Sequence, residues 1–290
     1  MRLGPGEHQR EVESEGGRRI YMIYVPSSWD GQTPLPVVLV LHGGGGSAQF
    51  ALGVHDWPAL AERERCLVVF PEATAEDPAS PAAVRENPRI WNDGSRRSAV
   101  AKRNVDDIGY LAAVLDDLEG QVAIDSRRVF VTGFSNGASM TFRAGVELSD
   151  RIAAIAPVSG HLCIADPQPS RCLPMLYIIG LADPINPAEG GPIDTPWGAR
   201  RQRPPIMDSI NVWVQLIGAS KQPESVHEEE GVKLARFGPG RNGCEVHLYT
   251  IEGQGHEWPG AQRTLPRFLS GPQTNKLNAT QVIWDFFASR

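Results

Sequence analysis

Short apolar runs, separated by polar or Gly- and Pro-rich segments, recur along the 290-residue chain. A run of about four to eight apolar residues bounded by turn residues is typical of a strand buried on both faces of a sheet. Ahead of these runs, two segments flank a turn that contains Gly16 and Gly17 and predict an antiparallel hairpin, over residues 11–14 and 19–25. The apolar runs themselves predict buried strands over residues 37–41, 67–71, 129–132, 152–158 and 175–179.

Helical periodicity occurs in several segments between and after these strands. The segment 104–118 carries one apolar stripe, and Asn104 or Asp106 can cap its N-terminus. The other predicted helices are residues 57–63, 206–216 and 280–288, and residues 233–237 and 245–251 predict two more strands, which pair with each other. Strands that alternate with helices predict an α/β fold with a mostly parallel central sheet covered on both faces. We expect one domain over residues 1–290.

Two long segments, 74–101 and 183–205, lack either periodicity and are predicted to be loops. Loops of this length in a compact domain are usually functional or disordered, and the second is a candidate lid. Trp91 in the first loop and Trp258 in a later loop are candidates to border a pocket and stack on an aromatic acyl group. Burial of either tryptophan as ordinary core is the alternative.

The most specific chemical pattern surrounds Ser135. A predicted strand leads into Gly133-Phe134-Ser135-Asn136-Gly137, and small residues of helical character follow. A strand, a G-x-S-x-G turn and a helix in this order are the setting of a nucleophilic serine. The two glycines lack the Cβ atoms that would collide in so sharp a turn. Ser135 is therefore the predicted nucleophile, with a plain strand-to-helix turn as the alternative.

A serine nucleophile needs a base, and the base needs a carboxylate that orients it. His256 follows the last predicted strand in a Gly-rich loop and is the candidate base, with His161 as its closest rival. Asp183 follows another strand and precedes a proline, so it is the candidate carboxylate. Asp194 and Asp208 are its possible substitutes. The resulting order of Ser, Asp and His along the chain is that of α/β-hydrolases.

A glycine-rich segment, His42-Gly43-Gly44-Gly45, follows the first buried strand. Glycines allow backbone N–H groups to approach a substrate carbonyl without obstruction by side chains. We expect the N–H of Gly44, or else of Gly43, to form an oxyanion hole with the N–H of Asn136. A flexible glycine loop is the alternative, and a phosphate-binding loop is disfavoured because no Gly-Lys-Ser/Thr follows.

The composition restricts the partners. A formal net charge of −6 argues against nucleic acids and anionic membranes as partners, and no run of 18 apolar residues occurs. His256-Glu257 and His227-Glu228 both lack the second histidine of a zinc-binding H-E-x-x-H motif. We therefore expect an ester as substrate and neither a metal nor a cofactor.

Four cysteines are too few for a disulfide-based scaffold. Cys163 and Cys172 share a Pro-rich loop and can pair in an exported protein, with free thiols as the alternative; Cys66 is a predicted core residue, and Cys244 has no evident partner. Residues 1–15 are polar and contain no apolar signal core. We expect a mature chain outside the cell or in the periplasm, with the cytoplasm as the alternative.

Several motifs together resemble the polyhydroxybutyrate depolymerase and feruloyl esterase group of α/β-hydrolases, which is related to carbohydrate esterase family one. Three motifs are specific only in combination: the strand–turn–helix segment around Ser135, called the nucleophile elbow, the Asp-Pro pair and the Gly-His-x-Trp-Pro-Gly motif. The matching segments are residues 42–48, 105–110, 124–129, 133–137, 153–160, 182–184, 255–260 and 283–287. The resemblance implies an α/β-hydrolase fold with Ser135, Asp183 and His256 as the catalytic triad.

The leading hypothesis is a serine carboxylic-ester hydrolase that acts through an acyl-enzyme. The resemblance implies hydroxycinnamoyl esters, such as feruloyl esters of cell-wall sugars, as the preferred substrates. Hydrolysis of poly(3-hydroxybutyrate) or its short oligoesters is the alternative. A third hypothesis is a non-catalytic binding protein on the same fold, since a fold alone does not determine a function.

Overall fold

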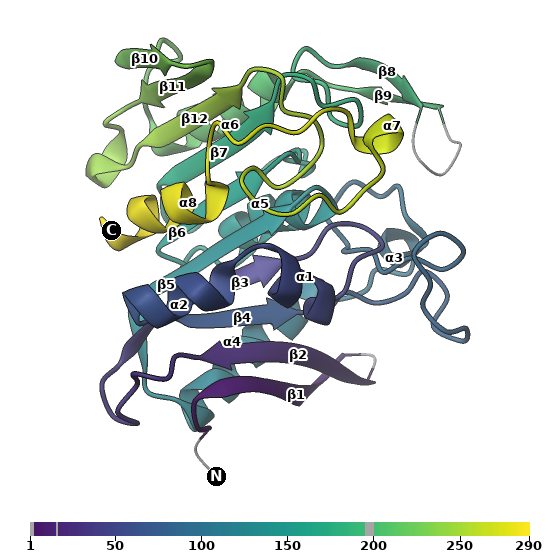
Figure 1. Cartoon of the computed structure of the whole chain (residues 1–290), viewed down its shortest axis with the longest axis vertical. Helices are drawn as coiled ribbons and strands as arrows, with labels where there is room; N and C mark the ends of the chain where they lie inside the picture. Colours follow the sequence, from purple (N-terminus) through teal and green to yellow (C-terminus); the bar gives the residue numbers. More distant parts are fainter. Residues whose placement is uncertain (1–2, 16, 195–199) are drawn as a thin grey trace.

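Ten strands form one sheet in the computed structural model, which describes residues 3–15, 17–194 and 200–290 (Figure 1). The order across the sheet is β1-β2-β4-β3-β5-β6-β7-β12-β11-β10. These strands are β1 (Gly6–Ser14), β2 (Gly17–Val25), β3 (Leu35–Leu41), β4 (Leu67–Pro71), β5 (Ile124–Phe134), β6 (Ala154–Val158), β7 (Met175–Gly180), β10 (Ser225–Glu229), β11 (Val232–Phe237) and β12 (Val246–Ile251).

The centre of the sheet is parallel and its edges are antiparallel. The six neighbouring strands from β4 to β12 pair in parallel, and every residue of β3, β4, β6 and β7 is buried. The β1–β2 hairpin extends one edge, and β11 with β10 extends the other. Because parallel strands end at the same edge of a sheet, the loops after β3, β5, β6, β7 and β12 gather there.

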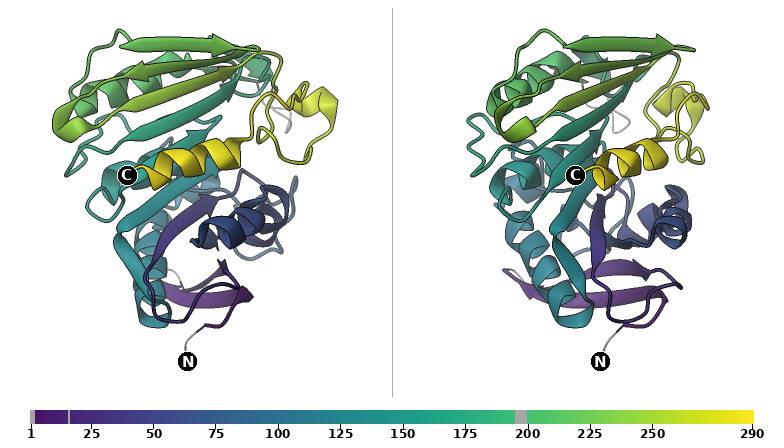
Figure 2. Two further views of the ribbon diagram at one scale, coloured as in Figure 1. Left: turned by 60° about the vertical axis from the view of Figure 1, so that its left-hand side comes forward. Right: turned by 90° about the vertical axis from the view of Figure 1, so that its left-hand side faces the viewer.

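Helices cover both faces, as Figures 1 and 2 show. One buried apolar cluster packs α4, α5 and α6 on one face, and a second packs α1, α2 and α8 on the other. The α/β fold with a mostly parallel sheet is therefore confirmed. The helices are α1 (Ala48–Val54), α2 (Trp57–Glu64), α3 (Ala99–Lys102), α4 (Asp107–Gln121), α5 (Asn136–Glu147), α6 (Ile206–Ile217), α7 (Arg267–Ser270) and α8 (Ala279–Ala288), with a 3₁₀ turn at Arg241–Gly243.

The segment 183–205 differs from its prediction as an irregular loop. Gly191–Asp194 (β8) and Arg200–Arg203 (β9) pair as a small antiparallel sheet. Backbone pairing between two short segments leaves little trace in a Pro- and Gly-rich sequence, so the prediction is wrong at these residues. Residues 195–199 of the predicted loop, and Gly16 of the hairpin turn, lie outside the described residues.

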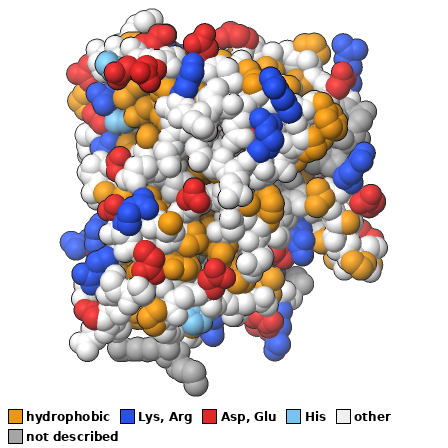
Figure 3. Space-filling model, viewed as in Figure 1, with side chains coloured by type: hydrophobic (Ala, Val, Ile, Leu, Met, Phe, Trp, Pro, Cys, Tyr) orange, Lys and Arg blue, Asp and Glu red, His pale blue; other side chains and the backbone are white. Residues whose placement is uncertain are grey.

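The cap of α4 is Asp106, whose side chain accepts a hydrogen bond from Gly109 N; Asn104, the other candidate, lies outside the helix. Within the described residues, no helix is long and apolar enough to cross a membrane. Acidic and basic side chains are interspersed over the face seen in Figure 3.

Candidate active site

The turn between β5 and α5 places Ser135 in a strained backbone conformation. Ser135 has a φ of 56° and a ψ of −116°, a region that residues with a side chain rarely adopt. A Cβ atom on Gly137 would lie 2.2 Å from Leu41 O, and one on Gly133 would lie 2.5 Å from Gly137 O. The two glycines therefore allow α5 to begin directly against the ends of β3 and β5, which exposes the Ser135 side chain at this edge of the sheet.

The structure brings Ser135, His256 and Asp183 together, although they lie far apart in the sequence. Ser135 Oγ is 2.9 Å from His256 Nε2, and His256 Nδ1 is 2.7 Å from Asp183 Oδ2. His256 and Asp183 are buried, whereas Ser135 is partly accessible. This is the geometry in which a carboxylate orients an imidazole toward a serine hydroxyl.

Asp183 is held on its other oxygen by the backbone. Asp183 Oδ1 accepts hydrogen bonds of 2.8 Å from both Ile185 N and Asn186 N. Burial opposes ionisation of the Asp183 carboxyl, but His256 and these N–H groups outweigh it and hold its pKa below the usual value. Asp183 is therefore ionised and fixed in orientation beside the imidazole.

Close backbone contact joins the loops that carry Asp183 and His256. A Cβ atom on Gly180 would lie 2.1 Å from Gln254 O, and Ala182 N donates to the same carbonyl over 2.9 Å. The parallel pairing of β7 with β12 brings these two loops to adjacent positions. His256 N in turn donates to Ser270 O over 2.6 Å. These backbone contacts thus fix the position of the loop that carries the imidazole.

The alternatives named from the sequence do not join this group. Asp194 lies in β8 and Asp208 in α6, and both are exposed without a hydrogen bond to His256. His161 is buried beside the start of α5, where its backbone N–H donates to Ser139 Oγ over 3.1 Å. No hydrogen bond joins the His161 ring to Ser135.

The glycine-rich loop after β3 lies against the start of α5. A Cβ atom on Gly43 would lie 3.5 Å from Ser135 Cβ, and one on Gly44 would lie 3.7 Å from Asn136 Cβ. Asn136 is the first residue of α5, where backbone N–H groups have no partner within the helix. Within the described residues, the N–H of Gly44 also has no hydrogen-bond acceptor. Two backbone donors are therefore available beside Ser135.

The sequence did not indicate the role of the Asn136 side chain. Asn136 Oδ1 accepts from Trp91 N over 2.7 Å, and its Nδ2 donates to Asp93 Oδ2 over 3.1 Å. The amide thereby fastens the long loop after β4 to the residue that follows the serine. The motif contains this asparagine, but its partners lie more than 40 residues away in a segment without periodicity.

A buried ion pair also supports the long loop after β4. Arg19 of β2 lies 2.7 Å from Asp107 of α4, and both side chains are almost fully buried. Asp107 Oδ2 also accepts from Asn92 N over 2.6 Å. Because Asp107 holds the cation and the loop backbone together, removal of either partner would leave a buried charge unpaired.

Trp91 and Trp258 are buried, which is the alternative named from the sequence and argues against contact of either ring with a substrate. Trp91 is 0% exposed and Trp258 is 1% exposed. Their indole N–H groups donate to internal acceptors, His42 O and Thr280 Oγ1 respectively. A loop position suggested accessibility, but both rings pack inward and belong to the core.

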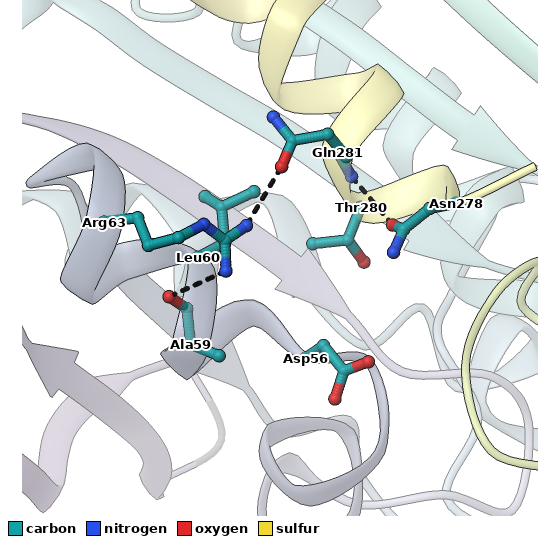
Figure 4. A pocket seen from close by; sticks show the side chains of 7 residues that line it. All are labelled: Asp56, Ala59, Leu60, Arg63, Asn278, Thr280 and Gln281. Atoms are coloured by element: carbon teal, nitrogen blue, oxygen red, sulfur yellow. Dashed lines mark hydrogen bonds between the residues drawn. The ribbon is translucent and has the colours of Figure 1, made fainter.

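The pocket in Figure 4 lies between α2 and the start of α8 and contains none of the three residues of the Ser-His-Asp group. Its volume is about 190 Å³. Arg63, its cationic side chain, already donates to Ala59 O and to Gln281 Oε1. We therefore centre the candidate site on Ser135 and not on this pocket.

The fold and this arrangement of serine, histidine and aspartate define a class of α/β-hydrolases. Residues 29–191, more than half of the chain, match the Phospholipase/Carboxylesterase family, so the chain belongs to that family. The protein is a carboxylic-ester hydrolase. The resemblance to the feruloyl esterase group is confirmed by relatives that are named as feruloyl esterases.

Three relatives illustrate the similarity. NocK of Nocardia uniformis subsp. tsuyamanensis, which is named as an inferred esterase, is 28% identical to this chain in an alignment that covers 96% of this chain and 81% of NocK. Feruloyl esterase B of Piromyces equi is 26% identical over 82% of this chain, which spans only 42% of that relative. The solved acetyl xylan esterase from Aspergillus awamori shares the fold, with a TM-score of 0.65, 14% identity and coverage of 98% of this chain and 100% of that one.

We predict that Gly137→Ala prevents folding of the elbow, because the new Cβ would lie 2.2 Å from Leu41 O and 2.5 Å from His42 O. The expected result is a large loss of soluble protein or a steep fall in the thermal unfolding midpoint. Gly120→Ala in α4 is the matched control, since its Cβ meets nothing within 4 Å, and alanine favours a helix by roughly 0.4–1 kcal/mol. Equal midpoints for the two variants would contradict the steric argument.

We also predict that stability falls as pH drops from about 6.5 toward 4. Burial lowers the pKa of His42 to about 4 and that of His55 to about 3. In that window the unfolded chain binds more protons than the folded one, so each histidine removes up to about 1.4 kcal/mol of stability per pH unit of acidification.

His55→Phe tests this prediction. His55 stacks on Trp258 with ring centroids 4.4 Å apart, and its Nδ1 has no hydrogen-bond partner among the described residues. Phenylalanine keeps a ring there and cannot be protonated, so the unfolding midpoint should depend less on pH than in the wild type. His227→Gln, at an exposed position, should keep the wild-type dependence. An unchanged slope for His55→Phe would refute the assignment.

Proposed function

We propose that the protein hydrolyses esters with Ser135 as nucleophile, His256 as general base and then acid, and Asp183 as the residue that orients His256. The observation that carries this proposal is the continuous hydrogen-bonded series from Asp183 Oδ2 to His256 to Ser135 Oγ, with separations of 2.7 and 2.9 Å. With Nδ1–H donated to the carboxylate, Nε2 is left to accept the serine proton.

The chemistry proceeds through an acyl-enzyme. Ser135 Oγ attacks the ester carbonyl carbon while His256 Nε2 takes the hydroxyl proton, and the alcohol then leaves with that proton. Water then attacks the acyl-enzyme carbonyl in the same way, with His256 as the base, and the acid is released. The strained elbow supports this route, because it presents Oγ beyond the sheet edge and within reach of the imidazole.

The oxyanion of each tetrahedral intermediate would be bound by backbone N–H groups of Asn136 and Gly44. The close approach of Gly44 to Asn136, and the hydrogen bonds that hold the Asn136 side chain to the 91–93 loop, support this assignment. Both donors belong to the backbone and are held by packing, so they need little reorganisation during the reaction.

Hydroxycinnamoyl esters are the proposed substrate class. The similarity to Feruloyl esterase B of Piromyces equi supports this proposal, whereas the buried tryptophans contribute nothing to it. An accessible aromatic ring is present instead at Phe268, which is 84% exposed on the short helix α7. The same helix ends at Ser270, whose carbonyl accepts the His256 N–H, so Phe268 belongs to the loop that supports the base.

We predict that Ser135→Ala and His256→Ala lower kcat for p-nitrophenyl butyrate by about 10⁴-fold or more. Asp183→Asn should lose activity on the order of 10³- to 10⁴-fold, because the imidazole is no longer held in the productive tautomer. Asp208→Asn, an exposed carboxylate on α6, is the matched control and should keep wild-type activity. Wild-type rates for Ser135→Ala would rule out the mechanism.

For the substrate class, we predict a higher kcat/KM for methyl ferulate than for p-nitrophenyl acetate or a 3-hydroxybutyrate oligomer. Phe268→Ala should raise KM for the ferulate ester and leave hydrolysis of the acetate ester nearly unchanged, because the acetyl group, unlike the feruloyl group, has no ring to contact Phe268. The measurement is a comparison of kcat/KM for the three esters with wild type and variant.

Each other outcome assigns a different function. Preference for the oligomer would indicate depolymerase activity with the same triad, and preference for acetate would indicate an acetyl esterase, as the acetyl xylan esterase relative suggests. If none of the esters is hydrolysed and a fluorophosphonate probe fails to label Ser135, a non-catalytic binding role replaces the enzymatic one.

A further inference from the structure

Two cysteines far apart in the sequence meet in the fold. Cys172 Sγ lies 2.8 Å from Cys244 Sγ, across 72 residues of sequence. Pairing of Cys172 with Cys163, considered from the sequence, does not occur: Cys163 Sγ contacts His161 O and Arg97 Nη2 instead. Their proximity in one loop suggested that pair. The pairing of β7 with β12 instead brings Cys244 to Cys172.

The cysteine pair lies where β7 and β12 begin. Cys172 lies shortly before Met175 of β7, and Cys244 lies shortly before Val246 of β12. Met175 and Val246 are opposite each other in the strand pairing. Met175 N donates to Glu245 O over 3.0 Å, which continues the strand pairing up to the cysteines. The thiol of Cys172 also donates to Arg241 O over 3.1 Å, so the backbone holds the Cys172 sulfur at this position.

We propose that Cys172 and Cys244 form a disulfide bond that ties together the starts of β7 and β12. A disulfide bond is about 2.05 Å long, so less than about 1 Å of movement joins the two sulfurs. The other two cysteines offer no comparable contact: Cys66 is fully buried in the core cluster, and Cys163 faces an arginine.

The oxidant is a small disulfide such as oxidised glutathione. The thiolate of the half-buried Cys172 attacks one glutathione sulfur, forms a mixed disulfide and releases one glutathione thiolate. Cys244, after it loses its proton, attacks the Cys172 sulfur and releases the second glutathione. The two protein thiols together lose two electrons and two protons, and one glutathione disulfide becomes two thiols. Burial and the neighbouring Cys172 thiol raise the pKa of Cys244 to about 12, consistent with Cys172 reacting first.

The position of the bond gives it a consequence for the candidate site. β7 leads into the loop of Asp183, and β12 leads into the loop of His256. A covalent link at the starts of these strands opposes their separation, and with it the separation of the two side chains at their far ends. The link also closes a 72-residue loop, and the constraint that a disulfide places on the unfolded chain grows with loop length.

A non-reducing peptide map tests the pairing. The full chain is equilibrated with oxidised and reduced glutathione, alkylated in denaturant and digested without reduction. The expected result is a peptide pair joined through Cys172 and Cys244, with alkylated Cys66 and Cys163. Alkylated Cys172 and Cys244, or a peptide joined through Cys163, would overturn the proposal.

Thermal unfolding supplies an independent measurement. Treatment of the oxidised protein with dithiothreitol should lower the unfolding midpoint by about 5–10 °C. Cys172→Ser should start at the lower midpoint and show no response to dithiothreitol, whereas the matched variant Cys163→Ser should respond like the wild type. If the wild type does not respond, or if Cys163→Ser abolishes the response, the proposal is wrong.

Discussion

The approach of α5 to the end of β3 is the constraint on which the rest of the site depends. The helix begins so close to the sheet that position 137 has no room for a Cβ beside Leu41 O. The same closeness applies at Gly160, where a Cβ would lie 2.6 Å from Ser135 O. Since the backbone at Ser135 adopts its strained φ only under these contacts, the position of Oγ follows from packing of main chain against main chain.

The other functional groups of the site are positioned by loops at the same edge of the sheet. Parallel pairing gathers the loops after β3, β5, β6, β7 and β12 at one edge of the sheet, and glycines at their bases allow neighbouring loops to touch. Polar contacts then fix each loop: Asn136 holds the loop of Trp91, and Asp183 accepts two N–H groups of its own loop. The buried Arg19–Asp107 pair also supports the Trp91 loop, because Asp107 accepts the N–H of Asn92. Each functional group is thus held by at least one contact outside its own strand.

Local signals in the sequence predicted the parts of this arrangement that are themselves local. The apolar runs located β3, β4, β6 and β7, and the Gly133–Gly137 motif located the elbow, because periodicity and turn chemistry act over a few residues. Asp183 and His256 could be proposed because each follows a predicted strand. The burial of Trp91 and Trp258, the β8–β9 pairing and the meeting of Cys172 with Cys244 depend on contacts between distant segments. No pattern within a short window encodes such contacts.

Close packing of main chain restricts the residues around Ser135 more than the residues of the exposed loops. The acetyl xylan esterase from Aspergillus awamori shares the fold with a TM-score of 0.65 at 14% identity, whereas Feruloyl esterase B, at 26% identity, is named for a different ester. Close backbone contacts at Gly133, Gly137 and Gly180 tolerate no side chain, so these positions can vary little while the fold persists. Exposed side chains in the segments 74–98 and 261–278, such as Val84 and Phe268, meet no such limit. We therefore propose that selection among esters depends on such exposed loop positions.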